Sequence, residues 1–262
     1  MKQSNKKGSE WVFGIHSVQA LLKTSSERVQ RLYLLQSRKD QRLTKLIALA
    51  EKQEVSFEFL PREELDKLIE NSGGSDFDDQ DINHQGAIAQ CSPGKVHDEA
   101  FLNELLDGLT EDPLLLVLDG VTDPHNLGAC LRTAEAAGVQ AVIAPKDNSA
   151  SVNPTVRKVA SGAAETLPYI VVTNLSRTLK ALQRRGVWIV GSAGEAEQSI
   201  YQTDFTGPKA IVMGAEGEGM RRLTREHCDF LASIPMQGHV GSLNVSVAVG
   251  VFLFESLRQR GK

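Results

Sequence analysis

The sequence of 262 residues has only three cysteines and no long apolar run. Cys91, Cys130 and Cys228 are odd in number and widely spaced, which argues against a disulfide framework and favours a reducing compartment. No stretch approaches the roughly 18 consecutive apolar residues of a membrane span. The opening MKQSNKKGSE lacks the apolar core of a signal peptide. We therefore expect a cytoplasmic protein.

Metal-binding and nucleotide-hydrolase patterns are also missing. The six histidines are scattered, with no pair at the spacing of metal ligands, so we expect no metal site. No GxxxxGK[ST] segment occurs, which argues against a Walker-type nucleotide hydrolase.

The formal net charge of −4 does not by itself favour nucleic acid as a partner. The acidity is local, however: residues 91–112 carry one lysine against six acids, whereas residues 113–262 carry 15 basic and 13 acidic side chains. The flanking regions can therefore still present a basic face to phosphates. The charge pattern permits RNA binding without indicating it.

Helix and strand patterns alternate in the first third of the chain and predict a small α/β domain. We expect a flexible terminus at 1–8, this domain at 9–92, an acidic linker with a short helix at 93–112, and a second domain at 113–262. The acidic, glycine-rich segment 70–83 is expected to be an exposed loop. The expected elements of the first domain are helices at 18–22, 43–52 and 62–69 and strands at 31–35, 55–60 and 86–90.

The second domain is predicted to be an open α/β domain around a parallel sheet. Its first strand, LLLVLDG, is a continuous apolar run, as in strands that are buried on both faces. Ligands of such sheets bind outside the carboxyl ends of the strands. The other expected elements are helices at 127–137, 155–165, 175–185 and 222–227, strands at 141–144, 169–172, 187–190, 210–213 and 231–235, and a final helix of small residues that starts near Val245.

Four loops after these strands carry polar groups. In the first, at 119–128, Asn126 suits either a helix cap or a functional role, and Arg132 on the following helix suits either a solvated position or a site. The second, at 191–197, suits a flexible connection. The other two, at 214–219 and 236–244, are more informative.

The loop GAEGEG at 214–219 has the wrong glycine spacing for a Rossmann fingerprint. Its two acids, Glu216 and Glu218, would also repel a pyrophosphate. An acidic, glycine-rich loop suits a ligand with positive charge or with NH and OH donors, such as S-adenosylmethionine. In the fourth loop, Ser242 and Asn244 suit either a site or the cap of the final helix.

Three motifs then occur in order along the chain. They are N-x-G-x-x-x-R at 126–132, G-A-E-G-E-G-M at 214–220, and I-P-M followed by S-L-N-V-S-V-A between 234 and 248. This set resembles the signature motifs of the SpoU/TrmH family of SPOUT RNA 2′-O-ribose methyltransferases. The resemblance covers nearly the whole chain and is nearest to bacterial members that methylate a guanosine of 23S ribosomal RNA in the peptidyl-transferase region.

The resemblance implies a fold and a set of partners. It implies a deep trefoil knot in the C-terminal domain, a ribosomal-protein-like N-terminal domain that binds large-subunit ribosomal RNA, and a homodimer with the active site at the subunit interface. The cofactor would be S-adenosylmethionine, without a metal. Transfer RNA as substrate, and a non-catalytic RNA-binding assembly factor, remain alternatives.

The resemblance also implies roles for ten residues. The catalytic group would be Arg132, Asn126, Glu216, Ser242 and Asn244. The cofactor would be held by Gly214, Gly219, Ile234, Met236 and Leu243.

Overall fold

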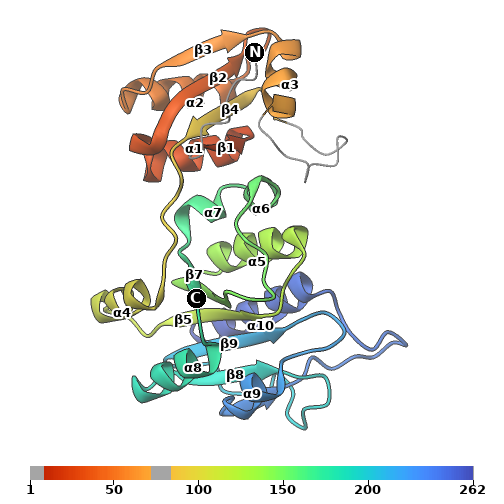
Figure 1. The fold of residues 1–262 in the computed structure, drawn as a ribbon. Helices are drawn as coiled ribbons and strands as arrows, with labels where there is room; N and C mark the ends of the chain where they lie inside the picture. The colour runs from red at the N-terminus through yellow and green to blue at the C-terminus, as the bar shows by residue number, and fades with distance from the viewer. Residues whose placement is uncertain (1–8, 72–83, 262) are drawn as a thin grey trace. The chain divides into compact units, whose positions relative to one another are not determined.

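The chain forms two compact units in the computed structural model, which describes residues 9–71 and 84–261. The first unit comprises the chain up to Lys95 together with residues 152–166, and the second comprises 96–151 and the chain from Leu167 onward. Figure 1 labels the helices and strands of each unit. The predicted flexible terminus at 1–8 and most of the predicted loop at 70–83 lie outside the described residues.

The first unit is built on a four-stranded mixed sheet with the order β1-β4-β2-β3. β4 runs antiparallel to both β1 and β2, whereas β2 and β3 are parallel. This confirms the predicted small α/β fold, but the sequence did not predict β1, which is only four residues long. The strands are β1 (Glu10–Phe13), β2 (Val29–Leu35), β3 (Phe57–Leu60) and β4 (Ala87–Cys91).

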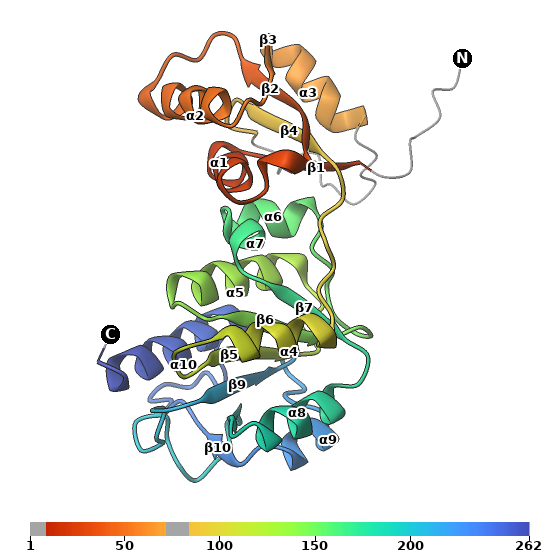
Figure 2. The same ribbon diagram turned by 90° about the vertical axis from the view of Figure 1, so that its left-hand side faces the viewer.

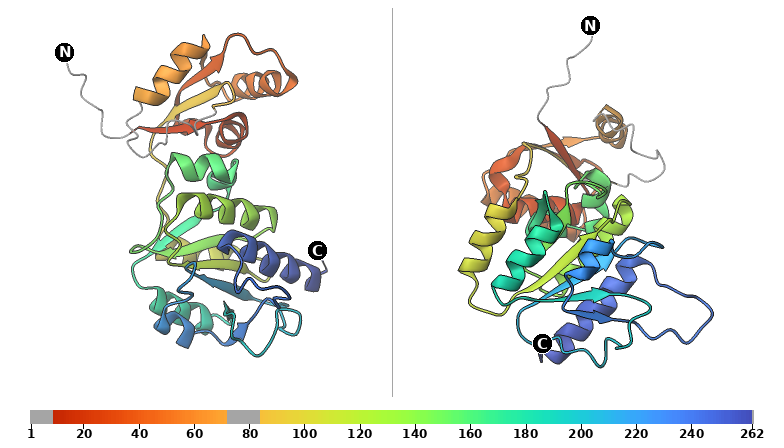
Figure 3. Two further views of the ribbon diagram at one scale, coloured as in Figure 1. Left: turned by 90° about the vertical axis from the view of Figure 1, so that its right-hand side faces the viewer. Right: turned by 60° about the horizontal axis from the view of Figure 1, so that its bottom comes forward.

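Helices cover both faces of this sheet. α1 (Ile15–Thr24) and α2 (Gln41–Lys52) pack leucines against one face, and α3 (Arg62–Asn71) packs Leu65 and Ile69 against the other. A 3₁₀ turn, η1 (Ser26–Arg28), leads from α1 into β2. Figure 3 shows these helices around the sheet.

The helix predicted at 155–165 is wrong, because the segment is broken into α6 (Pro154–Ala160) and α7 (Ala163–Thr166). Ser161 and Gly162, with φ of 53° and 102°, adopt left-handed backbone conformations that end α6. A Cβ on Gly162 would lie 2.9 Å from the Cβ of Ala20 on α1. Glycine therefore allows α6 and α7 to pack against α1 and β1 within the first unit.

A charge cluster of alternating sign lies within the first unit. Arg157 of α6 bonds to Glu165 of α7 and, at 3.0 Å, to Glu10 of β1. Arg28 bonds to the same two carboxylates, at 3.3 Å and 2.9 Å. The side chains of Glu165 and Arg157 are only 1% and 8% exposed. Each buried charge thus has two partners of opposite sign, which offsets its loss of hydration.

The second unit is built on a six-stranded sheet with the order β10-β8-β9-β5-β6-β7, in which every pair is parallel. This confirms the predicted open α/β fold. The central strands are buried because helices cover both faces. The strands are β5 (Leu114–Asp119), β6 (Ala141–Pro145), β7 (Tyr169–Val172), β8 (Trp188–Ser192), β9 (Lys209–Gly214) and β10 (Phe230–Ala232).

The helices of the second unit form two layers, one on each face of the sheet (Figure 2). One layer holds α5 (Pro124–Ala136) and α10 (Val245–Gln259). The other holds α4 (Glu99–Gly108), α8 (Leu175–Arg184) and α9 (Arg222–Glu226). Leu102 of α4 belongs to the core of this unit, so the short helix of the predicted linker packs against the sheet. Within the described ranges, no helix is long and apolar enough to cross a membrane.

The charge cluster leads to a prediction about the first unit. Arg157→Ala should lower its free energy of unfolding by about 3 kcal/mol, because Glu165 remains buried with one partner fewer. Arg62→Ala removes an ion pair to Asp66 from a site where the arginine is 77% exposed, and should cost less than about 1 kcal/mol. Urea unfolding monitored by Trp11 fluorescence in a Trp188→Phe background measures both. Equal losses in the two variants would show that the cluster does not stabilise this unit.

Candidate functional site

The strand order brings the first and third polar loops together. β5 and β9 are neighbours, and Asp119 at the end of β5 is in register with Gly214 at the end of β9. The loops that follow these two strands therefore leave the same edge of the sheet side by side. This is the edge at which open α/β domains bind ligands.

Asn126 does not cap α5, so that alternative for it is wrong. The cap is Asp123, whose carboxylate accepts the backbone N–H of His125 at 2.9 Å, with Pro124 at the first helical position. The Asn126 side chain instead donates to Glu216 Oε2 at 3.3 Å and accepts from Asn244 Nδ2 at 2.8 Å. Asn126 thus joins the loops that carry the second and third motifs.

The loop after β9 folds back as a small hairpin. Ala215 and Gly219 exchange two backbone hydrogen bonds, of 3.0 Å and 2.9 Å. Gly217 and Gly219 have φ of 84° and 72°, a region that favours glycine. Glu216, in the turn of this hairpin, is exposed. The glycines therefore form a turn that presents an acid at the edge of the sheet.

Position 214 requires glycine for a steric reason, not for its backbone conformation. Its backbone is not in the left-handed region, but a Cβ at this position would lie 2.1 Å from the carbonyl carbon of Gly219 and 2.2 Å from the nitrogen of Met220. No side chain fits there without opening the hairpin. A substitution at Gly214 would thus disturb the loop itself before it reached any ligand.

An ion pair that the sequence did not predict, between the buried Asp119 and the half-exposed Arg221, anchors the base of the hairpin. Asp119 is fully buried, and its carboxylate accepts hydrogen bonds from the backbone N–H of Arg221 at 2.9 Å and from its Nε at 2.7 Å, with Nη2 of the guanidinium at 2.5 Å in an ion pair. The pair ties the residue that follows the hairpin to the end of β5. The sequence feature that could have indicated this pair is Asp119 itself, an acid at the end of an otherwise apolar strand.

Asn244 caps α10, which confirms one of its two possible roles. Its Oδ1 accepts from the backbone N–H of Ser246 at 2.9 Å and from the Ser246 hydroxyl at 2.6 Å. A hydrogen-bonded chain therefore runs from Glu216 through Asn126 and Asn244 to Ser246. Ser246 matches the third motif but was not among the predicted site residues.

Two predicted catalytic residues stand outside this chain of hydrogen bonds. Ser242 is exposed and has no hydrogen bond to any residue that the structure describes. Arg132 lies on α5, six residues after Asn126, and is exposed, with no ion pair among the described side chains. Its guanidinium is therefore available to an anion or a substrate oxygen.

The predicted cofactor residues lie on two segments. Gly214 and Gly219 belong to the hairpin after β9, and the other three lie between β10 and α10. Ile234 and Leu243 are half-buried, whereas Met236 is 37% exposed. Exposed backbone, a partly open apolar surface and the acids of the hairpin thus occur in the segments assigned to a ligand.

The cysteines do not offer a nucleophile. Burial raises the pKa of Cys130, on α5 between Asn126 and Arg132, to about 12. Burial also raises the pKa of Cys91 and that of Cys228 to about 12. These thiols stay protonated at neutral pH, and the thiolate is the reactive form. The arrangement therefore favours direct reaction at the exposed polar groups over covalent catalysis by a cysteine.

Two family models match the chain. The model of the SpoU rRNA methylase family matches residues 113–254, and that of the RNA 2′-O ribose methyltransferase substrate-binding domain matches residues 11–96. The first of these contains all ten predicted site residues. The second spans the sheet of the first unit.

Curated relatives cover both units. The chain is 57% identical over 251 residues to the 23S rRNA (guanosine-2′-O-)-methyltransferase RlmB of Pseudomonas syringae, covering 96% of each chain. It is 56% identical over 252 residues to the protein of that name in Escherichia coli K12, covering 96% of this chain and 99% of the other.

Solved structures share the fold. The SpoU methyltransferase AviRb from Streptomyces viridochromogenes, in complex with AdoMet, has a TM-score of 0.76 at 22% identity and covers 98% of this chain and 94% of its own. A crystal structure titled RNA 2′-O ribose methyltransferase has a TM-score of 0.77 at 25% identity and covers 97% of this chain and 90% of its own.

The ion pair beneath the hairpin generates a prediction. Arg221→Ala leaves the Asp119 carboxylate buried with only a backbone partner, and should cost about 2 kcal/mol of stability. Hydrogen exchange at the amides of Ala215 and Gly219 should accelerate, because the base of the hairpin is released. Mass-spectrometric exchange over peptide 214–221 measures this.

Arg222→Ala is the matched control. Arg222 is 79% exposed and pairs with Glu226 on the same helix, so its loss should leave the hairpin amides protected. Unchanged protection in Arg221→Ala would show that the pair with Asp119 does not hold the loop.

Proposed function

The chain belongs to the SpoU rRNA methylase family, and on that premise we propose that it transfers a methyl group from S-adenosylmethionine to the ribose 2′-hydroxyl of a guanosine in 23S ribosomal RNA. The observation that carries the proposal is the hydrogen-bonded chain of Glu216, Asn126 and Asn244, which unites one polar residue from each motif at the ligand-binding edge of the sheet. Relatives with this activity in their name align along both units. That coverage favours ribosomal RNA over transfer RNA as the substrate, and a cytoplasmic location is part of the proposal.

The residues present fit S-adenosylmethionine. Gly214 and Gly219 would offer backbone groups, and Ile234, Met236 and Leu243 would offer apolar surface. The exposed acids of the hairpin complement the positive sulfur and the amine, and they accept from hydroxyl groups. The cofactor supplies a methyl group that is already electrophilic on cationic sulfur, with a neutral thioether as leaving group. No metal is needed to activate it.

The residues of the chain then have two tasks, to align the ribose and to activate its hydroxyl. Arg132 would stabilise the developing alkoxide or hold the adjacent phosphate, because its guanidinium is exposed and unpaired within the described part of the chain. Asn126, Glu216, Ser242 and Asn244 would orient the ribose and Arg132. Alignment of two reactants in this way can supply several kcal/mol of the barrier reduction.

The first unit would bind the RNA. Its match to a substrate-binding family model supports this role. RNA of mixed sequence is recognised through shape, phosphates and 2′-hydroxyls, which suits a separate binding domain. The boundaries of 9–92, 93–112 and 113–262 belong to this proposal.

A deep trefoil knot in the C-terminal domain is also part of the proposal. One observation supports it: the last helix, rich in small residues, packs against α5 and β9, which lie earlier in the chain. A threaded chain requires close approach of backbones of this kind.

A homodimer with its active site at the subunit interface completes the proposal. α10 carries an apolar stripe on its outer face: Val247 and Phe254 are 52% and 53% exposed, and Val251 between them is half-buried. Such a face on the layer that also carries Arg132 suits burial against a second copy. The partner would then complete the surroundings of Arg132.

Arg132→Ala tests the mechanism. Turnover should fall by at least about a hundredfold, the typical loss when one group that stabilises developing charge is removed. Arg132→Lys should restore little, since lysine lacks the planar fork. Methyl transfer to a 23S RNA transcript gives the rate, and calorimetry should find cofactor affinity nearly unchanged. Turnover near the wild-type value would remove Arg132 from the mechanism.

Charged substitutions on α10 test the dimer. Val247→Asp and Phe254→Asp should yield monomers with little methyltransferase activity, because each would bury a carboxylate without a partner. Leu223→Asp, at a 51% exposed apolar position on α9, is the matched control and should stay dimeric. Sedimentation velocity measures the mass. If both α10 variants sediment as the wild type does, the interface lies elsewhere.

A further inference from the structure

Helix α8 carries a group of basic residues that neither the motifs nor the proposed active site use. Between Glu165 and Glu195 the sequence contains no acid, and its four charged residues are Arg177, Lys180, Arg184 and Arg185. All four lie on α8 or directly after it, and all are exposed. The opposite side of the helix packs Leu175, Leu179 and Leu182 into the core of the second unit.

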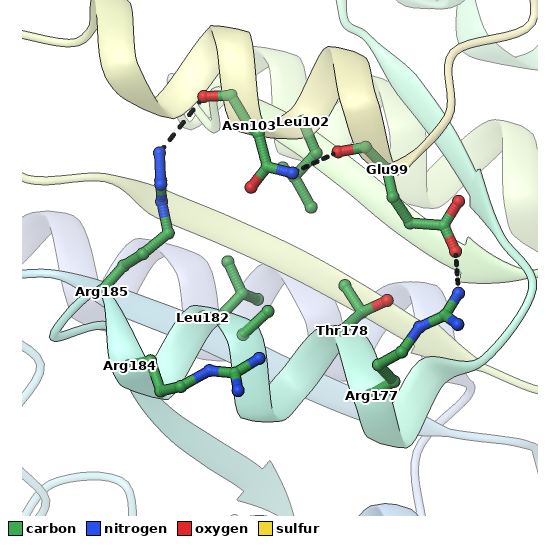
Figure 4. A pocket seen from close by; sticks show the side chains of 9 residues that line it. Glu99, Leu102, Asn103, Arg177, Thr178, Leu182, Arg184 and Arg185 are labelled. Atoms are coloured by element: carbon green, nitrogen blue, oxygen red, sulfur yellow. Dashed lines mark hydrogen bonds and ion pairs between the residues drawn. The ribbon is translucent and has the colours of Figure 1, made fainter.

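These four cations fall into two pairs. Arg177 bonds to Glu99 at 3.3 Å, and Arg185 bonds to Asp107, so both are tied to α4. Lys180 and Arg184 have no hydrogen bond or ion pair to any described residue. Figure 4 shows Arg184 without a partner beside the bridges that Arg177 and Arg185 make to α4. Like charges four residues apart on a helix destabilise it by a few tenths of a kcal/mol, so the pair is not explained by stability.

Two hollows, each of about 330 Å³, adjoin these side chains. The hollow towards α4 includes Glu99 in its lining and is therefore electrically mixed. The second has no carboxylate in its lining, which consists of Asn174, Ser176, Arg177, Lys180 and Arg184. Amide, hydroxyl and cationic donors without an acid are the groups that contact phosphate oxygens in nucleic-acid complexes.

We propose that the surface formed by Asn174, Ser176, Arg177, Lys180 and Arg184 binds the phosphate backbone of the RNA substrate. This inference rests on the proposed function, since it takes RNA as the substrate. Lys180 and Arg184 are one turn apart, about 6 Å along the helix axis, which lets them contact neighbouring phosphates of one strand. An acidic protein is the less suitable occupant, because no apolar or aromatic residue lines the hollow to form the dry centre of a protein interface.

The phosphate contacts of this surface would not depend on the base sequence of the RNA. Phosphate contacts fix the register of a nucleic acid on a protein, whereas base contacts select the sequence. The surface on α8 would therefore add RNA contacts to those of the first unit, at regions of the substrate away from the modified ribose.

The test is the double variant Lys180→Gln/Arg184→Gln in the full-length protein. The probe is a transcript of the part of 23S ribosomal RNA that contains the peptidyl-transferase region, titrated over a range of salt concentrations. The loss of two phosphate contacts should weaken binding about tenfold at moderate salt and reduce the slope of log K against log salt by about 1.5. Cofactor affinity and thermal stability should not change, and KM for RNA should rise more than kcat falls.

Arg222→Gln/Arg225→Gln is the matched control, because it removes the same charge from the neighbouring helix α9, where each arginine already pairs with Glu226 or Glu195. Its RNA affinity should stay within about twofold of the wild type. Equal losses in the two double variants would overturn the proposal, since total charge would then explain the effect.

Two other results would also overturn it. One is unchanged RNA affinity and salt slope in the α8 variant. The other is normal binding of the transcript with reduced methylation of ribosomal particles, which would identify a ribosomal protein as the partner. Failure of the wild-type protein to methylate any RNA would refute the proposed function instead, and the binding titration would still report on α8.

Discussion

The arrangement of the candidate site depends on the fully buried carboxylate of Asp119. It lies at the end of the central strand β5, accepts two hydrogen bonds from Arg221 and forms an ion pair with its guanidinium, directly after the glycine hairpin. A buried carboxylate is costly unless it is bonded, so the loop that supplies these donors is held in place by the need to satisfy it. Glu216 in the turn of the hairpin is thereby held within reach of Asn126. Steric packing acts in the same direction, because Gly214 leaves no room for a Cβ between β9 and the hairpin.

Charge pairing divides the basic residues of the chain by role. In the first unit, Arg28 and Arg157 are each bonded to the buried Glu165 and to the partly exposed Glu10, and hold α6 and α7 against α1 and β1. In the second unit, Arg177 and Arg185 bond to acids of α4 and so link α8 to α4. The cations that remain unpaired among the described residues of the second unit include Arg132 on α5 and the Lys180–Arg184 pair on α8. These unpaired cations are the ones to which we assign contacts with RNA, even though the formal net charge of the chain is −4.

The errors of sequence-based prediction have physical causes. A helical pattern continues through 155–165, yet the segment breaks where Ser161 and Gly162 adopt left-handed conformations, and α1 approaches Gly162 too closely for a side chain. The strand β1 was missed, and its antiparallel pairing with β4, far along the chain, decides its conformation. Asn126 matches the preference for helix caps, but Asp123 with Pro124 is the stronger start signal, and only the folded chain shows that Asn126 turns to Glu216 and Asn244 instead.

The sequence by itself determined the two α/β folds, the parallel sheet and the three motif-bearing loops, because these follow from local periodicity and residue order. It also placed the polar loops at one edge, since the carboxyl ends of parallel strands coincide. Only the tertiary structure decided that residues 152–166 pack with the first unit, that Asp119 pairs with Arg221, and that Lys180 and Arg184 stay unpaired. Such contacts join residues far apart in the chain, here up to 147 positions, and their energies depend on burial that no local pattern specifies.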